Sequence, residues 1–100
     1  MKVRVLREAC CAADDQMGPL DAVYRVDADA SFAELIAEIR ASRFLQFSST
    51  HQRLSGELGG VTVVEVPAAS DATPVFFVSA SAPVGRMVRG RTLHFRFRHA

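Results

Sequence analysis

Side chains alternate strictly between apolar and polar from Thr92 to Arg98, and no other feature of the chain constrains the fold as strongly. The apolar set is Leu93, Phe95 and Phe97, and the polar set is His94, Arg96 and Arg98. Because successive side chains of a β-strand point to opposite faces of the sheet, this alternation predicts a half-buried strand. We therefore expect a sheet with one face against a core and a cationic face open to solvent.

The length and composition of the chain are those of one small globular domain. It has 100 residues, of which 49% are hydrophobic. A chain of this size can bury a single core but is too short for separate catalytic and binding domains. We expect residues 1–100 to form one domain.

Positive charge is concentrated in the second half of the chain. Residues 1–50 contain six basic and eight acidic side chains, whereas residues 51–100 contain six basic and three acidic ones. From Arg86 onward there are five arginines and no carboxylate. The formal net charge of the whole chain is only +1, so bulk attraction to nucleic acid or to an anionic membrane is expected to be weak.

The sequence predicts a soluble cytoplasmic protein without a membrane span. No apolar run approaches the roughly 20 residues needed to cross a bilayer. Residues 1–7 place charges among their apolar side chains, unlike the central region of a signal peptide. Cys10 and Cys11 are adjacent, so their α-carbons lie about 3.8 Å apart, too close for an unstrained disulfide. We expect both to be free thiols in a reducing compartment.

The clearest local signal is a helix that begins at Ser31. Ser31 and Glu34 form the capping-box pattern, in which the hydroxyl and the carboxylate each accept a hydrogen bond from a backbone N–H at the helix start. The apolar residues with helical spacing are Phe32, Leu35, Ile36 and Ile39. A helix over about residues 31–42 is expected, with one apolar stripe facing the core.

Strands are expected on both sides of this helix. The predicted strands cover residues 3–10, 22–26, 44–49, 61–66, 75–78 and 92–98. The fourth and fifth of them form a predicted hairpin. Gly56, Gly59 and Gly60 are interpreted as turn glycines, and residues 79–90 as an irregular connection. This order predicts an α+β fold, a β-grasp-like mixed sheet of five to six strands with one helix packed on one face.

Four segments resemble the ubiquitin-like proteins of the β-grasp superfamily. They are the apolar strand beginning at Met1, the passage from Val26 through Ser31 to Ile39, Gln52-Arg53-Leu54 and Thr92-Leu93-His94-Phe95. The resemblance implies that the first and last strands lie side by side and parallel at the centre of the sheet, with the helix across one face. Residues 61–78 would then add an apolar hairpin to the family pattern. The sequence ends at His99-Ala100 without the Gly-Gly that conjugating and sulfur-carrying members need, so neither activity is expected.

That strand arrangement would bring polar residues from distant segments onto one open sheet face. The expected face contains Lys2, Arg4, Arg25, His94, Arg96 and Arg98. We expect it to bind an acidic protein or peptide, which would make the chain a non-enzymatic protein-interaction module. The alternative interpretation is that these charges only keep an exposed sheet face soluble.

Nucleic-acid binding through the C-terminal arginines is a weaker alternative. Clustered arginines attract phosphates, but proteins that bind single strands usually expose aromatic side chains for stacking. Phe95 and Phe97 alternate toward the core instead. Nucleic acid is therefore not an expected partner unless Tyr24 or Phe44 is exposed beside the arginines.

The candidate reactive side chains do not form a recognisable catalytic or metal-binding pattern. The candidates are Cys10, Cys11, His51, His94 and His99, and neither a nucleophile motif nor a zinc-ligand spacing joins them. Asp27 and Asp29 precede the predicted helix, where its dipole favours negative charge. We expect no catalytic residue, no metal ligand and no cofactor.

A small enzyme or ligand-binding protein is the alternative to an interaction module. Its site would be a pocket between the hairpin over residues 61–78 and the helix, with Cys10 or His51 as reactive groups. The run from Val75 to Val78 is apolar on both strand faces, so it is expected to be buried centrally or covered by a second copy. A homodimer formed through residues 61–78 is therefore one of the arrangements that the sequence allows.

Overall fold

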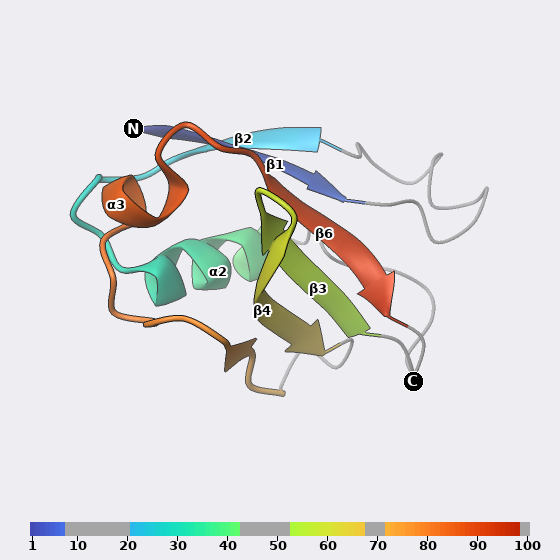
Figure 1. Cartoon of the computed structure of the whole chain (residues 1–100). Coiled ribbons are helices and arrows are strands. Elements are labelled where there is room, and N and C mark those ends of the chain that lie inside the picture. Colours follow the sequence, from blue (N-terminus) through green and yellow to red (C-terminus); the bar gives the residue numbers. More distant parts are fainter. Residues whose placement is uncertain (8–20, 43–52, 68–71, 99–100) are drawn as a thin grey trace.

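A computed structural model describes residues 1–7, 21–42, 53–67 and 72–98, with the side chains of Phe97 and Arg98 excepted. Within these residues the chain forms six strands and two helices (Figure 1). In chain order they are β1 (Lys2–Arg7), β2 (Asp21–Arg25), α2 (Phe32–Ala41), β3 (Arg53–Leu58), β4 (Val61–Pro67), β5 (Val75–Phe76), α3 (Val84–Val88) and β6 (Leu93–Arg98).

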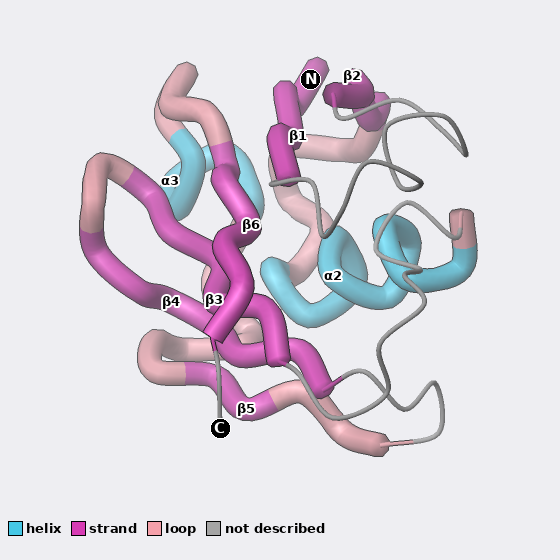
Figure 2. The backbone as a smooth tube through the Cα atoms, turned by 90° about the vertical axis from the view of Figure 1, so that its right-hand side faces the viewer, coloured by secondary structure: helices cyan, strands magenta, loops and turns pink. Residues whose placement is uncertain are grey.

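The strands form one mixed sheet in the order β2-β1-β6-β3-β4-β5. The neighbours β1 and β6 are parallel, with Val5 opposite Leu93, and every other neighbouring pair is antiparallel. Helix α2 lies along one side of the sheet (Figure 2). The expected α+β fold, a β-grasp-like sheet with a helix on one face, is therefore confirmed.

Helix α2 begins where its capping box predicts. The Ser31 hydroxyl accepts a hydrogen bond from the Glu34 N–H at 3.1 Å, and the Glu34 carboxylate accepts one from the Ser31 N–H at 3.3 Å. At the other end the Ser42 hydroxyl donates to the Ile39 carbonyl at 2.7 Å. These side chains satisfy backbone groups that a helix leaves without partners at its ends.

Replacing Ser31 by alanine is expected to lower the free energy of unfolding by about 1 kcal/mol, because the cap of α2 is lost. Urea denaturation followed by circular dichroism measures this change. Ser79→Ala is the matched control, since the Ser79 hydroxyl bonds only the exposed Ser81 hydroxyl among the described residues. The control should change stability by no more than about 0.5 kcal/mol. Equal effects of the two substitutions would contradict the capping role.

The core lies between α2 and the sheet. Its fully buried sheet side chains include Val3, Val5, Leu54, Leu58, Val64, Leu93 and Phe95, which meet Phe32, Leu35, Ile36 and Ile39 of α2. The rings of Phe32 and Phe76 meet edge to face, with centroids 5.8 Å apart. Val3, Val5, Leu93 and Phe95 thus lie on the core side, as their alternation predicts.

Strand β3 was not expected, and it corrects the interpretation of Gly56 as a turn glycine. Gly56 lies within β3, opposite Val64 of β4 and opposite Phe95 of β6. An ideal Cβ at residue 56 would stand 2.6 Å from Val64 Cγ1 and 3.0 Å from Phe95 Cε1. Only glycine leaves room there for both side chains. Gly59 and Gly60, with φ of 59° and 83°, form the expected turn between β3 and β4.

The region before β6 also differs from its expected irregular structure. Helix α3 forms there, and its N-terminal backbone packs on the loop before α2. The Val84 N–H donates a hydrogen bond to the Ala30 carbonyl at 2.7 Å, and the Gly85 N–H donates one to the Ala28 carbonyl at 2.9 Å. These tertiary contacts explain why a segment with weak local signals is helical.

The expected pairing of residues 61–66 with 75–78 is present as β4 and β5, although β5 covers only Val75–Phe76. Strand β4 also pairs with β3 on its other side, so it lies inside the sheet. The predicted strand over residues 44–49, together with Cys10, Cys11, His51 and His99, lies outside the described residues.

Candidate functional site

The face of the sheet opposite α2 collects the side chains that were expected to share a surface. Lys2 lies opposite Arg25, and Leu6 lies opposite His94, so each pair points to the same side of the sheet. We call this surface the open face. Among the side chains that the structure describes, its charged and imidazole groups are Lys2, Arg4, Asp21, Arg25, Arg53, Glu57, Glu65, His94 and Arg96.

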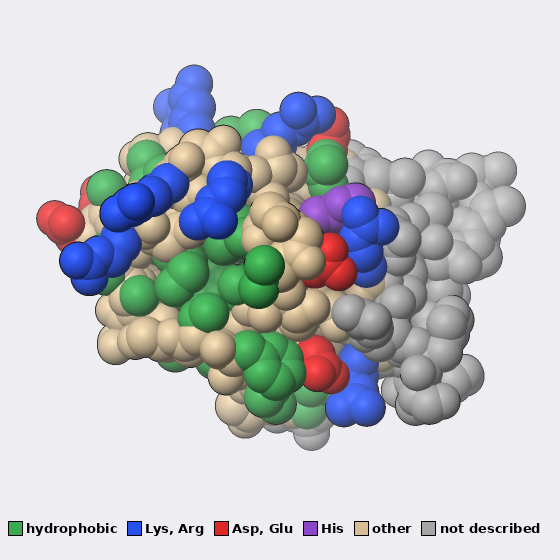
Figure 3. Space-filling model, in the orientation of Figure 1, with side chains coloured by type: hydrophobic (Ala, Val, Ile, Leu, Met, Phe, Trp, Pro, Cys, Tyr) green, Lys and Arg blue, Asp and Glu red, His purple; other side chains and the backbone are tan. Residues whose placement is uncertain are grey.

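The structure brings together five of the six predicted binding residues, namely Lys2, Arg4, Arg25, His94 and Arg96. The backbone of the sixth, Arg98, lies in β6 opposite Arg53. The open face over β6, β3 and β4 is turned toward the viewer in Figure 3, where acidic side chains lie next to basic ones.

Carboxylates from neighbouring strands partner several of these arginines. Arg4 Nη2 lies 3.7 Å from Asp21 Oδ2. Arg96 Nε donates a hydrogen bond to Glu57 Oε1 at 3.1 Å. Arg53 Nη1 lies 3.4 Å from Glu65 Oε1. The Arg4–Asp21 pair is exposed on both sides, so it contributes about 0–1 kcal/mol and leaves Arg4 accessible to a competing carboxylate at small cost. The side chains of Glu57 and Glu65 are only 15% and 26% exposed.

Lys2 and Arg25 differ from these arginines. Both side chains are exposed, and they stand directly opposite one another on β1 and β2. Among the described residues neither side chain makes an ion pair or a hydrogen bond. Like charges directly opposite in a sheet repel each other. This end of the open face therefore carries positive charge that the described part of the chain does not neutralise.

A depression of about 540 Å³ lies on the open face beside β5. It is lined by Arg53, Ser55, Thr62, Glu65 and Phe77. Phe77 is 54% exposed and supplies an apolar wall next to the Arg53–Glu65 pair. On the other side of the same strands, toward α2, the rings of Phe32 and Phe76 pack together. This is the region in which a small enzyme or ligand-binding protein was expected to have its pocket.

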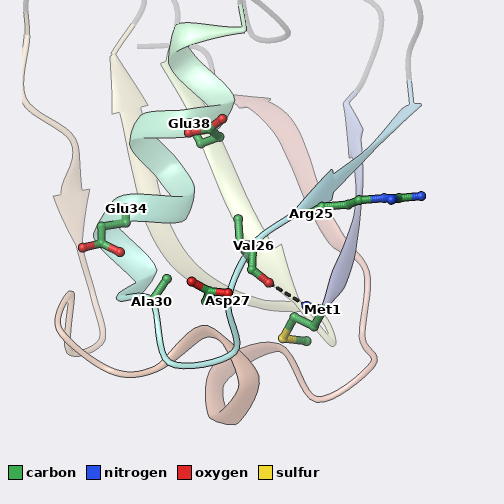
Figure 4. Close-up of a pocket in the computed structure, with 7 residues that line it drawn as sticks. All are labelled: Met1, Arg25, Val26, Asp27, Ala30, Glu34 and Glu38. Atoms are coloured by element: carbon green, nitrogen blue, oxygen red, sulfur yellow. Dashed lines mark hydrogen bonds between the residues drawn. The ribbon is translucent and has the colours of Figure 1, made fainter.

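A second depression, of about 460 Å³, lies between the end of β2 and α2 (Figure 4). Its lining residues are Met1, Arg25, Val26, Asp27, Ala30, Glu34 and Glu38. The Met1 ammonium donates to the Val26 carbonyl at 2.6 Å, while the Arg25 side chain extends away from the glutamates. The carboxylates come from separate positions: Glu34 and Glu38 lie on α2, and Asp27 lies in the loop that precedes it.

Tyr24 lies on the side of β2 that faces α2, opposite Val3. Its hydroxyl is hydrogen-bonded to the Ser42 hydroxyl at 2.6 Å. Burial raises the pKa of the Tyr24 phenol above its ordinary value, the Ser42 hydrogen bond lowers it, and the Glu38 carboxylate raises it. The ring is therefore not a stacking platform beside the open-face arginines. Phe44, the other aromatic considered for that role, lies outside the described residues.

The described residues contain no group of three or more His, Cys, Asp or Glu side chains that could hold a metal ion. None of the helices described is long and apolar enough to cross a membrane. Comparison with protein-family models, curated proteins and solved structures found no match to this chain. The resemblance to ubiquitin-like proteins therefore stays a prediction.

Proposed function

We propose that this chain is a non-enzymatic interaction module that binds an acidic protein or peptide through the open face of its sheet. The observation that carries the proposal is the Lys2–Arg25 pair, two exposed cations held directly opposite one another without a carboxylate partner in the described structure. A carboxylate supplied by a partner would relieve their repulsion, which gives the partner a site for favourable electrostatic contact.

The remainder of the open face supports the same kind of partner. Its described side chains include five Lys or Arg and three carboxylates, so the surface is positive overall. Its Arg4–Asp21 pair is exposed on both sides, so Arg4 can exchange one carboxylate for another. The apolar Phe77 and the depression beside it supply a contact that does not depend on charge.

The test is an NMR titration of the isotope-labelled protein with a short oligoglutamate peptide. Chemical-shift changes are expected at the backbone amides of Lys2, Arg4, Arg25 and Arg96, and not at those of α2. The double variant Lys2→Gln, Arg25→Gln should bind the peptide about tenfold more weakly, which corresponds to about 1.4 kcal/mol. Binding should also weaken at higher salt, because exposed charges are screened.

The matched control places the same change of net charge elsewhere. Ala37→Glu, Ala41→Glu adds two negative charges on the exposed side of α2. If bulk charge drives binding, this control will weaken it as much as Lys2→Gln, Arg25→Gln does. That result, or shift changes confined to α2, would refute the proposed surface.

A further inference from the structure

Three arginines gather at one end of the sheet, outside the open face. We call Arg86, Arg89 and Arg91 the α3 corner: the first lies in α3 and the other two in the segment that joins α3 to β6. Figure 3 shows Lys and Arg side chains over α3 and this segment. Residues 86–91 contain no carboxylate. Asp27 and Asp29 belong to the loop on which α3 packs, but neither forms an ion pair with these arginines in the described structure.

One cation of the corner is held in place. Arg91 donates from Nη2 to the Met87 carbonyl at 3.1 Å and from Nε to the Val88 carbonyl at 3.3 Å. Its Nη1 lies 3.5 Å from the position that a Cβ of residue 59 would take, so the guanidinium also covers the β3–β4 turn. A side chain ordered in this way loses little conformational freedom when it meets a ligand.

The other two cations are available. Arg86 and Arg89 are exposed, and within the described structure their side chains make no ion pair or hydrogen bond. The corner itself is anchored to the fold, because α3 packs on the loop before α2 and buries Val84 and Val88. It thus presents two free guanidinium groups and one fixed group on a rigid support.

The backbone of Arg89 is held in an unfavourable conformation. Its φ of 48° and ψ of 46° are left-handed, and it is the one non-glycine residue with positive φ in the described chain. An L side chain is disfavoured there because its Cβ crowds the carbonyl that follows, and helices commonly place glycine at this position. Because Arg89 is exposed, packing does not explain the arginine. Strained backbone of this kind clusters at active sites and ligand clamps.

We propose that the α3 corner is a second binding surface, which takes an acidic peptide segment of a partner protein. Arginine guanidinium groups form strong, often bidentate, hydrogen bonds to carboxylates. Residues 79–92 contain no aromatic side chain, so the corner lacks the stacking platform that single-stranded nucleic acid uses. This site goes beyond the proposed function because none of its residues belongs to the open face.

The experiment measures fluorescence anisotropy of a labelled peptide of alternating Glu and Gly residues, at low salt. The variant Arg86→Gln, Arg89→Gly should bind this peptide about tenfold more weakly than the unchanged protein. Arg89→Gly alone should weaken binding while raising Tm by a few degrees, because glycine relieves the left-handed strain. A loss of binding in a more stable protein cannot come from unfolding.

Matched variants separate this surface from the open face. The corner variant Arg86→Gln, Arg89→Gly lowers the net charge by two. The open-face variant Lys2→Gln, Arg25→Gln makes the same change of net charge on the open face. The control variant Ala37→Glu, Ala41→Glu makes it on α2. Weakening by the corner variant beyond that of the α2 control supports the α3 corner, whether or not the open-face variant also weakens binding. If only the open-face variant weakens binding of the peptide, the α3 corner is refuted as a binding surface and the proposed function is supported.

Three further outcomes would also refute the α3 corner as a binding surface for an acidic peptide. They are no measurable binding of the peptide, equal weakening by the corner and α2 variants, and tighter binding of a single-stranded oligonucleotide than of the peptide through Arg86 and Arg89.

Discussion

Gly56→Ala is expected to lower the free energy of unfolding by about 1–3 kcal/mol, the usual cost of forcing an extra methyl group into a packed core. The new Cβ would stand 2.6 Å from Val64 Cγ1 and 3.0 Å from Phe95 Cε1, and both neighbours are fully buried in adjacent strands. Either β3 moves away from β4 and β6 or the two side chains leave their positions. Urea denaturation measures the loss.

A double-mutant cycle makes this prediction specific. Val64→Ala removes the closest colliding atom, so the double variant Gly56→Ala, Val64→Ala should be less destabilised than the sum of the two single variants. Gly60→Asn serves as the control for glycine replacement, because nothing lies within 4 Å of a Cβ there and asparagine tolerates the positive φ. Additive effects in the cycle would show that Gly56 does not make room for Val64.

Phe95→Ala is expected to cost about 3–5 kcal/mol, the range for deleting a buried aromatic ring. Phe95 is 0% exposed and lies in β6, beside β1 on one side and β3 on the other. A loss of this size is a large part of the stability of a small domain, so the variant should unfold at a much lower urea concentration than the unchanged protein.

Phe77→Ala is the same chemical change at an exposed position. Phe77 keeps 54% of its surface exposed, and its truncation should alter the free energy of unfolding by no more than about 0.5 kcal/mol. Calorimetry or denaturant unfolding of both variants gives the comparison. Similar losses for the two would contradict the placement of Phe95 in the core and Phe77 on the open face.

The elements that could be predicted from the sequence are those with local signals. The capping box and the apolar spacing after Ser31 act within a single helix, and they located α2 to within a residue or two. The alternation from Leu93 likewise depends only on which way successive side chains point, and it correctly placed Leu93 and Phe95 in the core.

Strand β3 shows what local signals cannot reveal. Its sequence, Arg-Leu-Ser-Gly-Glu-Leu, contains no β-branched residue and has a central glycine, both unfavourable for an isolated strand. It forms because β4 and β6 pair with it on both sides. Helix α3 is similar, since its short segment contains Gly85 and depends on contacts with residues 28 and 30.

Most cations of the candidate site were predictable, whereas Arg53 and the carboxylates were not. Alternation indicated that His94 and Arg96 share a face, and the expected parallel pairing added Lys2 and Arg4. The register that sets Glu57 beside Arg96 joins residues far apart in sequence, in a strand that was not expected. The strain at Arg89 had no sequence signal, because arginine is an ordinary helix residue and only its backbone angles distinguish it.

The parallel pairing of β1 with β6 has a consequence for how a partner would act on this protein. Val5 and Leu93 are neighbours only after the intervening chain has been brought into place, so their pairing exists in the folded protein and not in the extended chain. A partner that contacts Arg4 and Arg96 together spans this junction and has no equivalent site on the unfolded chain. Its binding would therefore stabilise the native state by an amount that rises with the ratio of the partner's concentration to its Kd, and unfolding would depend on that concentration.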